Sequence, residues 1–340
     1  MEVRKIQQTG GSSFIITLPK EWVKTLNLKK NDPIGIIIKP EGSLVITPKL
    51  TNESEQTTKE FEVSDKTNKT SLLRKLIGAY ISGYTYIEIK SNERIPTKIR
   101  DTTRIFTNST IGQEIIEETD TSIIIKDLLN PTEMPFERTI KRMYIIAKGM
   151  HDDVMSYLES KDENIIKDID ERDNDLDKLH WLVARQHNIL SQNFNLGEKM
   201  NIKPGKSTTY FLISRIIERI GDHEVKIIKN IQKNPDNIID KQILDKILLA
   251  GKKSLNIFNK SINSFFKKDI KESNENIEEV YELERFCDEI NEIALKQEGG
   301  KSLKIGYITD SLRRIAEYSQ DISENVINYI VSDYNFKKLK

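Results

Sequence analysis

The feature that most restricts the fold is a long helical periodicity. Apolar residues recur every three or four positions through most of residues 136–333, which places them on one face of an α-helix. The first such series is Ile140, Met143, Tyr144, Ala147, Met150, Val154 and Leu158. Breaks in the periodicity fall near Ser160, across 193–205, near 234–235, across 266–269 and at 299–300. The pattern therefore predicts six long helices that pack as bundles, in two sets of three. We call this region the helical body.

Residues 1–50, which we call the head, have the composition of β-structure. The β-branched run 14–18 ends at Pro19, residues 20–26 can form a short helix, and 34–38 and 44–46 are further apolar strands around a turn at 41–43. A few short strands cannot bury both faces of a sheet by themselves. We therefore expect the head to be an obligate dimer in which a second chain supplies the missing core.

A polar, aperiodic stretch at residues 51–59 reads as a linker to a third region. Residues 60–130, the middle domain, alternate between strand and helix patterns, with strands predicted at 61–63, 86–90, 113–117 and 122–126 and helices at 71–82 and 96–106. The fold class that follows is α+β multidomain. The middle domain contains no chemical motif, so we expect it to space the head from the helical body.

Charge is unevenly distributed along the chain. The whole sequence has a formal net charge of +0, whereas the head carries eight Lys and Arg against four Asp and Glu, which gives it +4. A basic head on an acidic remainder favours contact with a polyanion. The sequence has one cysteine, no long apolar span and no apolar N-terminal leader. These features predict a cytoplasmic protein with no membrane span.

Acidic pairs four residues apart recur in the helical body. The second helix of each predicted set carries one pair, Glu171 with Asp175 and Glu284 with Asp288, at an offset of 113 residues. The third helix of each set carries another pair, Glu218 with Asp222 and Glu317 with Asp321, at an offset of 99 residues. Residues four apart lie on one helix face, so helices packed side by side would bring four carboxylates together in each bundle.

Two interpretations of these pairs remain open. Oxygen-only clusters suit hard metal ions, and Mg²⁺, Mn²⁺, Fe or Zn²⁺ would turn the repulsion into ligation. Alternatively, the acids form ordinary salt bridges, because several arginines lie near them and because other acidic pairs, such as Asp173 with Asp177, have the same spacing.

The segment 213–227, ISRIIERIGDHEVKI, resembles the signature helix of the PhoU phosphate-uptake regulators, and Glu171-x-x-x-Asp175 followed by LVARQ resembles the preceding helix of that family. The resemblance covers about residues 136–333 and implies tandem three-helix bundles, a link to phosphate homeostasis, and metal binding at the repeated motifs. The implied ligands are Glu171, Asp175, Glu218, Asp222, Glu284, Asp288, Glu317 and Asp321. In the second repeat, Gln320 and Ile322 replace Gly221 and His223, so metal binding is less expected there.

The head resembles the AbrB/SpoVT DNA-binding module through Thr17-Leu18-Pro19-Lys20-Glu21, the pair Leu26-x-Leu28, and Asp32 before a strand. The resemblance implies a swapped-hairpin β-barrel shared by two chains, which touches DNA. The implied DNA contacts are Arg4, Lys5, Ser12, Ser13, Lys20 and Lys24. Asn31 stands where the family often has glycine, which a left-handed turn tolerates, and Val23 stands where a base is frequent, which predicts modest affinity. Such a head on a PhoU-like body resembles an archaeal architecture.

Three functions compete at this point. The first is a homodimeric DNA-binding regulator of phosphate uptake whose helical body takes its input from metal, phosphate status or a partner. The second is an interaction protein that damps a phosphate ABC-transporter ATPase and uses the head only to dimerise. The third is a di-metal carboxylate enzyme, against which the lack of paired histidine ligands counts. We expect a regulator rather than an enzyme.

Overall fold

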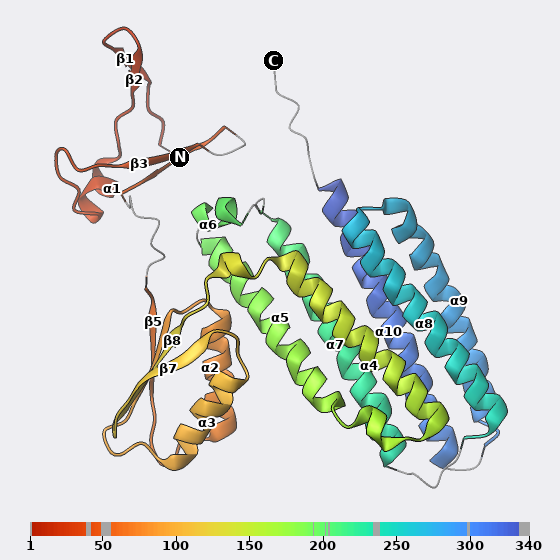
Figure 1. Cartoon of the computed structure of the whole chain (residues 1–340). Coiled ribbons are helices and arrows are strands. Elements are labelled where there is room, and N and C mark those ends of the chain that lie inside the picture. Colours follow the sequence, from red (N-terminus) through yellow and green to blue (C-terminus); the bar gives the residue numbers. More distant parts are fainter. Residues whose placement is uncertain are drawn as a thin grey trace. The chain divides into compact units, whose positions relative to one another are not determined.

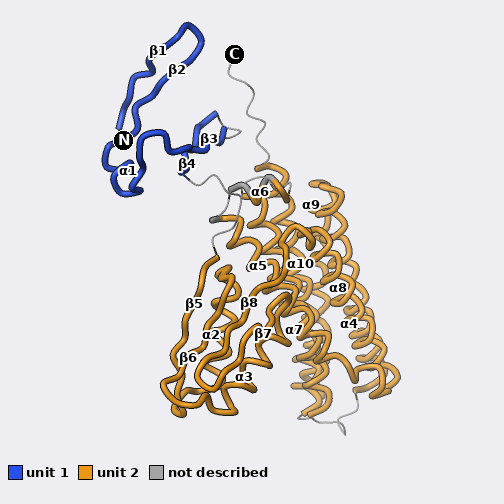
Figure 2. Tube along the Cα trace, turned by 60° about the vertical axis from the view of Figure 1, so that its left-hand side comes forward, with its two compact units in different colours: residues 1–55, 335–340 blue, residues 56–334 orange. Residues whose placement is uncertain are grey.

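The computed structural model describes residues 2–38, 42–48, 56–192, 194–200, 202, 205–233, 239–297 and 300–332. The chain divides into two compact units, with the head inside residues 1–55 and the middle domain and helical body inside residues 56–334 (Figure 2). No described helix combines the length and the apolar character that crossing a membrane requires.

The head consists of short elements in the predicted order. They are β1 (Gln7–Thr9), β2 (Ser13–Ile15), α1 (Lys20–Thr25), β3 (Gly35–Ile38) and β4 (Leu44–Thr47). β1 pairs with β2 and β3 pairs with β4, both antiparallel, so the described head contains two separate hairpins. Gly10 and Gly11 turn the first hairpin at positive φ, and Asn31 has a φ of 74°, as expected for a left-handed turn. Glu41 of the predicted second turn lies outside the described residues.

The head has no core of its own. No described residue of the head is buried, and several large apolar side chains face solvent, with Val3, Phe14 and Ile38 all more than 70% exposed. An isolated two-stranded hairpin is marginally stable at best in water. The exposure of these side chains is consistent with the predicted dimer, in which a second chain would cover them.

The middle domain is a four-stranded sheet with two helices. Its elements are β5 (Thr58–Glu62), α2 (Lys69–Ile81), β6 (Tyr86–Lys90), α3 (Thr97–Asn108), β7 (Gln113–Glu118) and β8 (Ser122–Asp127). The strand order is β5-β6-β8-β7, with β5 parallel to β6 and the other neighbours antiparallel. Figure 1 shows α2 and α3 on the same face of this sheet. Thr58 and Lys59 belong to β5 rather than to a linker.

The alternating strand pattern explains this core. Ile87 and Ile89 of β6 and Ile123 and Ile125 of β8 point to the helix-covered face and are fully buried, together with Leu76, Tyr80, Ile99 and Phe106 of the helices.

Six long helices form the helical body, as predicted. They are α4 (Phe136–Ser160), α5 (Ile169–Gln192), α7 (Lys206–Gln232), α8 (Lys241–Lys267), α9 (Ile270–Ala294) and α10 (Gly300–Val331), with a short α6 (Phe194–Lys199) between α5 and α7. α4, α5 and α7 form one bundle, and α8, α9 and α10 form the other (Figure 1). α7 packs against α10 and α4 against α8, so one continuous apolar core runs through both bundles.

The first helix of each bundle ends in the same way. Lys161 after α4 and Lys268 after α8 both adopt left-handed backbone conformations, with φ of 60° and 58°. An aspartate follows each lysine. Asp162 accepts a hydrogen bond from the Asn164 amide, and Asp269 accepts one from the Glu272 amide. The two bundles therefore share a local stop signal as well as their acidic pairs.

The middle domain is docked on α5, which corrects the expectation that it only spaces the head from the body. Arg185 is buried and donates hydrogen bonds to the Tyr80 carbonyl, to the Tyr84 carbonyl (2.9 Å) and to Asp127 Oδ2 (2.9 Å from Nε). One helical turn away, Asn188 Nδ2 donates to the Ile81 carbonyl at 2.8 Å. Trp181, one turn in the other direction, packs against the core of the middle domain.

Candidate functional site

Four carboxylates meet where α5 packs against α7. Glu218 and Asp222 lie on α7, and Asp173 and Asp177 lie on α5. Burial raises the pKa of Glu218 to about 7, and the charges of Asp222 and Asp177 add to this against the opposing charge of Arg215. Burial and the charges of Asp222 and Asp177 likewise raise the pKa of Asp173 to about 6. We call these four residues the carboxylate cluster.

Two predicted ligands on α5 lie elsewhere. Glu171 is exposed, and Asp175 is 45% exposed, 3.8 Å from Lys178 Nζ. The pair that faces α7 is Asp173 with Asp177, which the sequence analysis mentioned only as another acidic pair with the same spacing.

The buried positions of α5 and α9 show which residues of the two helices correspond to each other. Leu176, Leu179 and Val183 of α5 are buried, and they correspond to the buried residues Cys287, Ile290 and Ala294 of α9 at a constant offset of 111 residues. Matching the acidic pairs of the sequence alone had given an offset of 113 residues. At 111, Asp173 and Asp177 are the counterparts of Glu284 and Asp288.

A glycine sets the close approach at the cluster. A Cβ atom on Gly221 would come within 2.4 Å of Leu176 Cδ1 and 3.5 Å of Asp173 Oδ1. Leu176 is fully buried and has little room to move away. Gly221 therefore allows α5 to lie against α7 with Asp173 beside Asp222.

The cluster leaves one oxygen without a partner. Glu218 Oε2 is buried and accepts no hydrogen bond among the described residues, and the nearest cation, Arg215 Nε, is 3.9 Å away. Among the described residues, no three or more His, Cys, Asp or Glu side chains are placed closely enough to form a finished metal site. The cluster is thus a strained group of acids that a proton or a cation would relieve.

The second repeat holds its acids differently. Arg313 of α10 lies 2.8 Å from Asp310 and 3.5 Å from Glu317, and Arg314 lies 2.7 Å from Glu317. At the offset of 99 residues, Arg313 stands where the first repeat has the buried Ser214. Arginine therefore neutralises acids in the second repeat that remain uncompensated in the first.

The other predicted ligands of this repeat do not form a matching cluster. Asp288 is exposed and Glu284 is half-buried, and both carboxylates influence the buried thiol of Cys287 and lie on the side of Arg313. Burial, followed by the charges of Glu324 and Glu317, raises the pKa of Asp321.

Sequence reasoning did not find a buried ion pair inside the first bundle, next to the second. His151 of α4 and Glu224 of α7 are 2% and 0% exposed, and His151 Nδ1 is 2.7 Å from Glu224 Oε1. The other ring nitrogen, Nε2, is 3.0 Å from the Gly251 carbonyl on α8. A carbonyl only accepts, so Nε2 carries a proton. His151 of α4 therefore contacts α7 of its own bundle and α8 of the second bundle.

The two-bundle geometry agrees with a family comparison. A family model described as the PhoU domain matches residues 140–231 and 247–326, which together make up half of the chain. The chain belongs to the PhoU family. The first matched segment spans most of α4 to α7, and the second spans most of α8 to α10, so each three-helix bundle is one PhoU repeat.

A solved structure shares this fold. The chain is similar to the phosphate transport system regulatory protein PhoU from Streptococcus pneumoniae, with a TM-score of 0.50 and 14% identity. The likeness covers 58% of this chain and 94% of that chain. No curated protein matches the chain.

The head of this PhoU family member matches a second model. The model described as "Antidote-toxin recognition MazE, bacterial antitoxin" covers residues 7–54, which confirms a MazE/AbrB-like head. Lys5, Lys20 and Lys24 are exposed, and Lys20 and Lys24 lie four residues apart on α1. Arg4 pairs with Glu2. Ser12 and Ser13 are exposed at the turn between β1 and β2.

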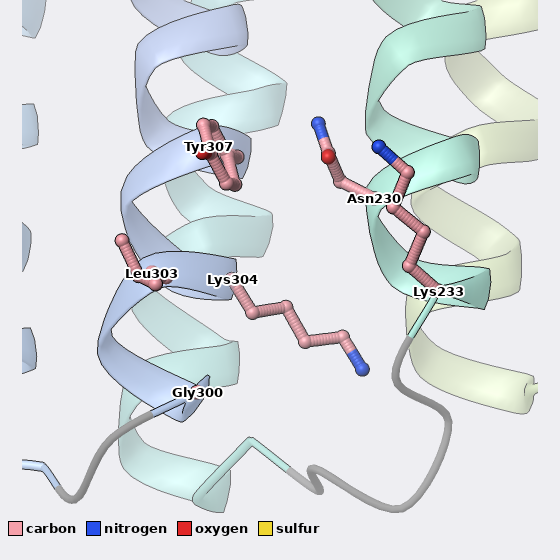
Figure 3. A pocket seen from close by; sticks show the side chains of 6 residues that line it. All are labelled: Asn230, Lys233, Gly300, Leu303, Lys304 and Tyr307. Carbon is pink, nitrogen blue, oxygen red and sulfur yellow. The ribbon is translucent and has the colours of Figure 1, made fainter.

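A cavity of about 360 Å³ lies elsewhere in the PhoU repeats, where α7 ends and α10 begins (Figure 3). Asn230 and Lys233 line it from α7, and Lys304 and Tyr307 from α10. Figure 3 shows the ammonium group of Lys233 beside the Asn230 amide, whereas that of Lys304 points to the opposite end. The two charges do not converge, so this cavity is a weak candidate for a site that binds a charged ligand.

Proposed function

We propose that this PhoU family member is a regulator of phosphate transport or homeostasis that binds DNA as a homodimer through its head. The observation that carries the proposal is the head itself. It exposes its apolar residues, which fits coverage by a second head, and it exposes lysines at positions 5, 20 and 24 that form no ion pair among the described residues. Lysines of this kind supply affinity for phosphate backbones without reading bases.

Binding of a fluorescent duplex at two salt concentrations tests this proposal. We expect the full chain to bind and its affinity to fall steeply with salt. The variant Lys20→Glu/Lys24→Glu should lose about tenfold or more in affinity, and the slope of log K against log salt should become shallower by about one for each DNA phosphate that the variant no longer binds.

A matched control separates these positions from net charge. Lys29→Glu/Lys30→Glu makes the same charge change in the same head, outside the predicted contacts. An equal loss in both variants would show only a general charge effect. If no protein binds DNA even at low salt, the head is a dimerisation device. The alternative, an interaction protein that damps a phosphate ABC-transporter ATPase, then takes the place of the first proposal.

We further propose that the carboxylate cluster holds a divalent or iron-type cation, such as Mg²⁺, Mn²⁺, Zn²⁺ or Fe²⁺. The residues fit such an ion because Glu218 Oε2 is buried without a partner and because the four acids repel one another. Glu218 and Asp222 would hold it together with Asp173 and Asp177. The bound cation would supply positive charge that lets all four carboxylates ionise. In the second repeat, Arg313 already provides this charge for Glu317.

Glu218→Gln is expected to stabilise the metal-free protein at pH 8 by about 1–3 kcal/mol. The folded-state pKa of Glu218, about 7, lies above its ordinary value of 4.5, so its contribution is fully present below pH 4.5 and is lost as pH rises to about 7. Glutamine does not ionise, so the variant does not lose this stability as the pH rises. Its amide can also donate a hydrogen bond to the neighbouring acids. Urea unfolding at pH 5 and pH 8 in EDTA measures the difference.

The same variant tests the cation. Mn²⁺ should raise the melting temperature of the wild type at pH 8, and this rise should shrink in Glu218→Gln but persist in Glu171→Gln, which changes an exposed acid two residues from the cluster. Equal shifts in all three proteins would show that the ion binds outside the cluster. A Glu218→Gln protein no more stable than wild type at pH 8 would contradict the strain argument itself.

A further inference from the structure

A small groove runs along α7 where this helix packs against α10. It encloses about 210 Å³, and Arg215, Arg219, Lys226 and His223 of α7 line it together with Tyr318 of α10. Ligand pockets for molecules of drug size commonly measure about 300–1,000 Å³. The groove is therefore suited to something smaller, and we call it the basic groove.

Two of the three cations of the basic groove form no ion pair among the described residues. Arg215 is 3.9 Å from Glu218, but Arg219 and Lys226 have no acidic side chain within ion-pair distance in this part of the chain. Arg215 and Arg219 are four residues apart and face the same side of α7, where like charges repel. The Arg219 guanidinium instead lies over the Tyr318 ring, 5.9 Å from its centroid.

His223 adds a buried polar group to the same groove. It is 8% exposed, its ring centroid is 5.7 Å from that of Tyr318, and its Nδ1 has no hydrogen-bond partner among the described residues. A protonated ring nitrogen of an imidazole can donate a hydrogen bond to an oxyanion bound in the groove.

Acidic residues limit what the groove can hold. Glu218 and Asp222 of α7 also line it. Asp310 of α10 acts on His223, and Asp321 of α10 and Arg219 act on each other, while Arg314 opposes Asp310 in its effect on His223. A large polyanion would meet these carboxylates, whereas a small anion can stay within reach of Arg219 and Lys226.

We infer that the basic groove binds a small oxyanion, with Arg219 and Lys226 as the main contacts and with Arg215 and His223 completing the site. A guanidinium presents parallel N–H donors that match two oxygens of a tetrahedral oxyanion, and an ammonium adds a point charge. Inorganic phosphate is the simplest anion of this chemistry. This inference goes beyond the proposed function, since it requires neither DNA binding nor a metal.

Calorimetric titration of inorganic phosphate into the full chain tests the inference. The buffer contains EDTA, and chloride keeps the ionic strength constant. We expect saturable binding, and Arg219→Gln and Lys226→Gln should each weaken it by about tenfold or more. Lys229→Gln is the matched control, because Lys229 is exposed on the same helix and lies 3.3 Å from Asp170, away from the groove. It should leave the affinity within about twofold of the wild type.

Glycerol phosphate in place of inorganic phosphate distinguishes a free anion from a phosphate ester. Tighter binding of the ester would assign the groove to a phosphorylated headgroup or metabolite, and tighter binding of phosphate would assign it to the free ion. Absence of saturable binding of both anions would overturn the inference, and so would an equal loss in Lys229→Gln. Circular dichroism of each variant confirms that these surface changes leave the fold intact.

Discussion

Replacing Arg185 with methionine is expected to lower the free energy of unfolding by about 3–5 kcal/mol. The change removes the guanidinium that holds the middle domain to α5. It leaves the Asp127 carboxylate, 9% exposed, without its cation, and it removes the side-chain donor to the carbonyls of Tyr80 and Tyr84. Urea unfolding followed by circular dichroism measures the loss. Hydrogen exchange should show lost protection in the middle domain before any appears in α8 or α9.

Two further variants measure how much of the loss comes from the unpaired charge of Asp127. Arg185→Met/Asp127→Asn should recover part of the loss, because the asparagine carries no charge and can still accept a hydrogen bond from the Leu129 amide. Arg104→Met breaks a pair with Glu118 in which the arginine is half exposed, so it should cost less than about 1 kcal/mol. If Arg185→Met costs no more than Arg104→Met, apolar contacts such as that of Trp181 hold the middle domain instead.

The second large effect is expected when leucine replaces His151. This change should lower the free energy of unfolding by about 3–5 kcal/mol near pH 6.5. Leucine fills a similar space but leaves Glu224 as a fully buried carboxylate with no cation, and it leaves the Gly251 carbonyl without its donor. Glu224→Gln should cost much less. A neutral imidazole can accept a hydrogen bond from the glutamine amide at Nδ1 and still donate from Nε2. Equal losses in the two variants would mean that packing, and not the buried charge, decides the effect.

The pH dependence of the free energy of unfolding provides an independent test of the pair His151 and Glu224. Burial lowers the pKa of His151, but the charge and hydrogen bond of Glu224 and the Gly251 carbonyl outweigh burial and raise it above 6.5. The stabilisation is therefore fully present below pH 6.5 and is lost as pH rises through the folded-state pKa. Glu224→Gln should flatten the stability profile above pH 6.5, whereas Glu218→Gln should flatten it between about pH 4.5 and pH 7.

The sequence by itself determined the elements and their order. Strict alternation defined β6 at residues 86–90, and the apolar spacing defined six long helices in the helical body. The predicted breaks near Ser160 and across 266–269 match the described ends of α4 and α8, whereas the break near 234–235 lies outside the described residues. The repeat was also visible, because acidic pairs recur at similar distances along the chain. Local periodicity is a property of a few neighbouring residues, so it survives in the sequence without knowledge of the fold.

The rotation of α5 was decided only by the tertiary structure. Asp173 with Asp177 and Glu171 with Asp175 have the same spacing, and a sequence does not say which pair turns toward α7. Packing chooses between them, because Leu176 must fit against Gly221. The same holds for contacts between distant elements. Asp127 with Arg185 and His151 with Glu224 are 58 and 73 residues apart, and no local pattern marks either pair. Burial makes an unpaired charge costly in free energy, so the pairing of these residues stabilises the fold. That burial arises only once the helices and the sheet have packed together.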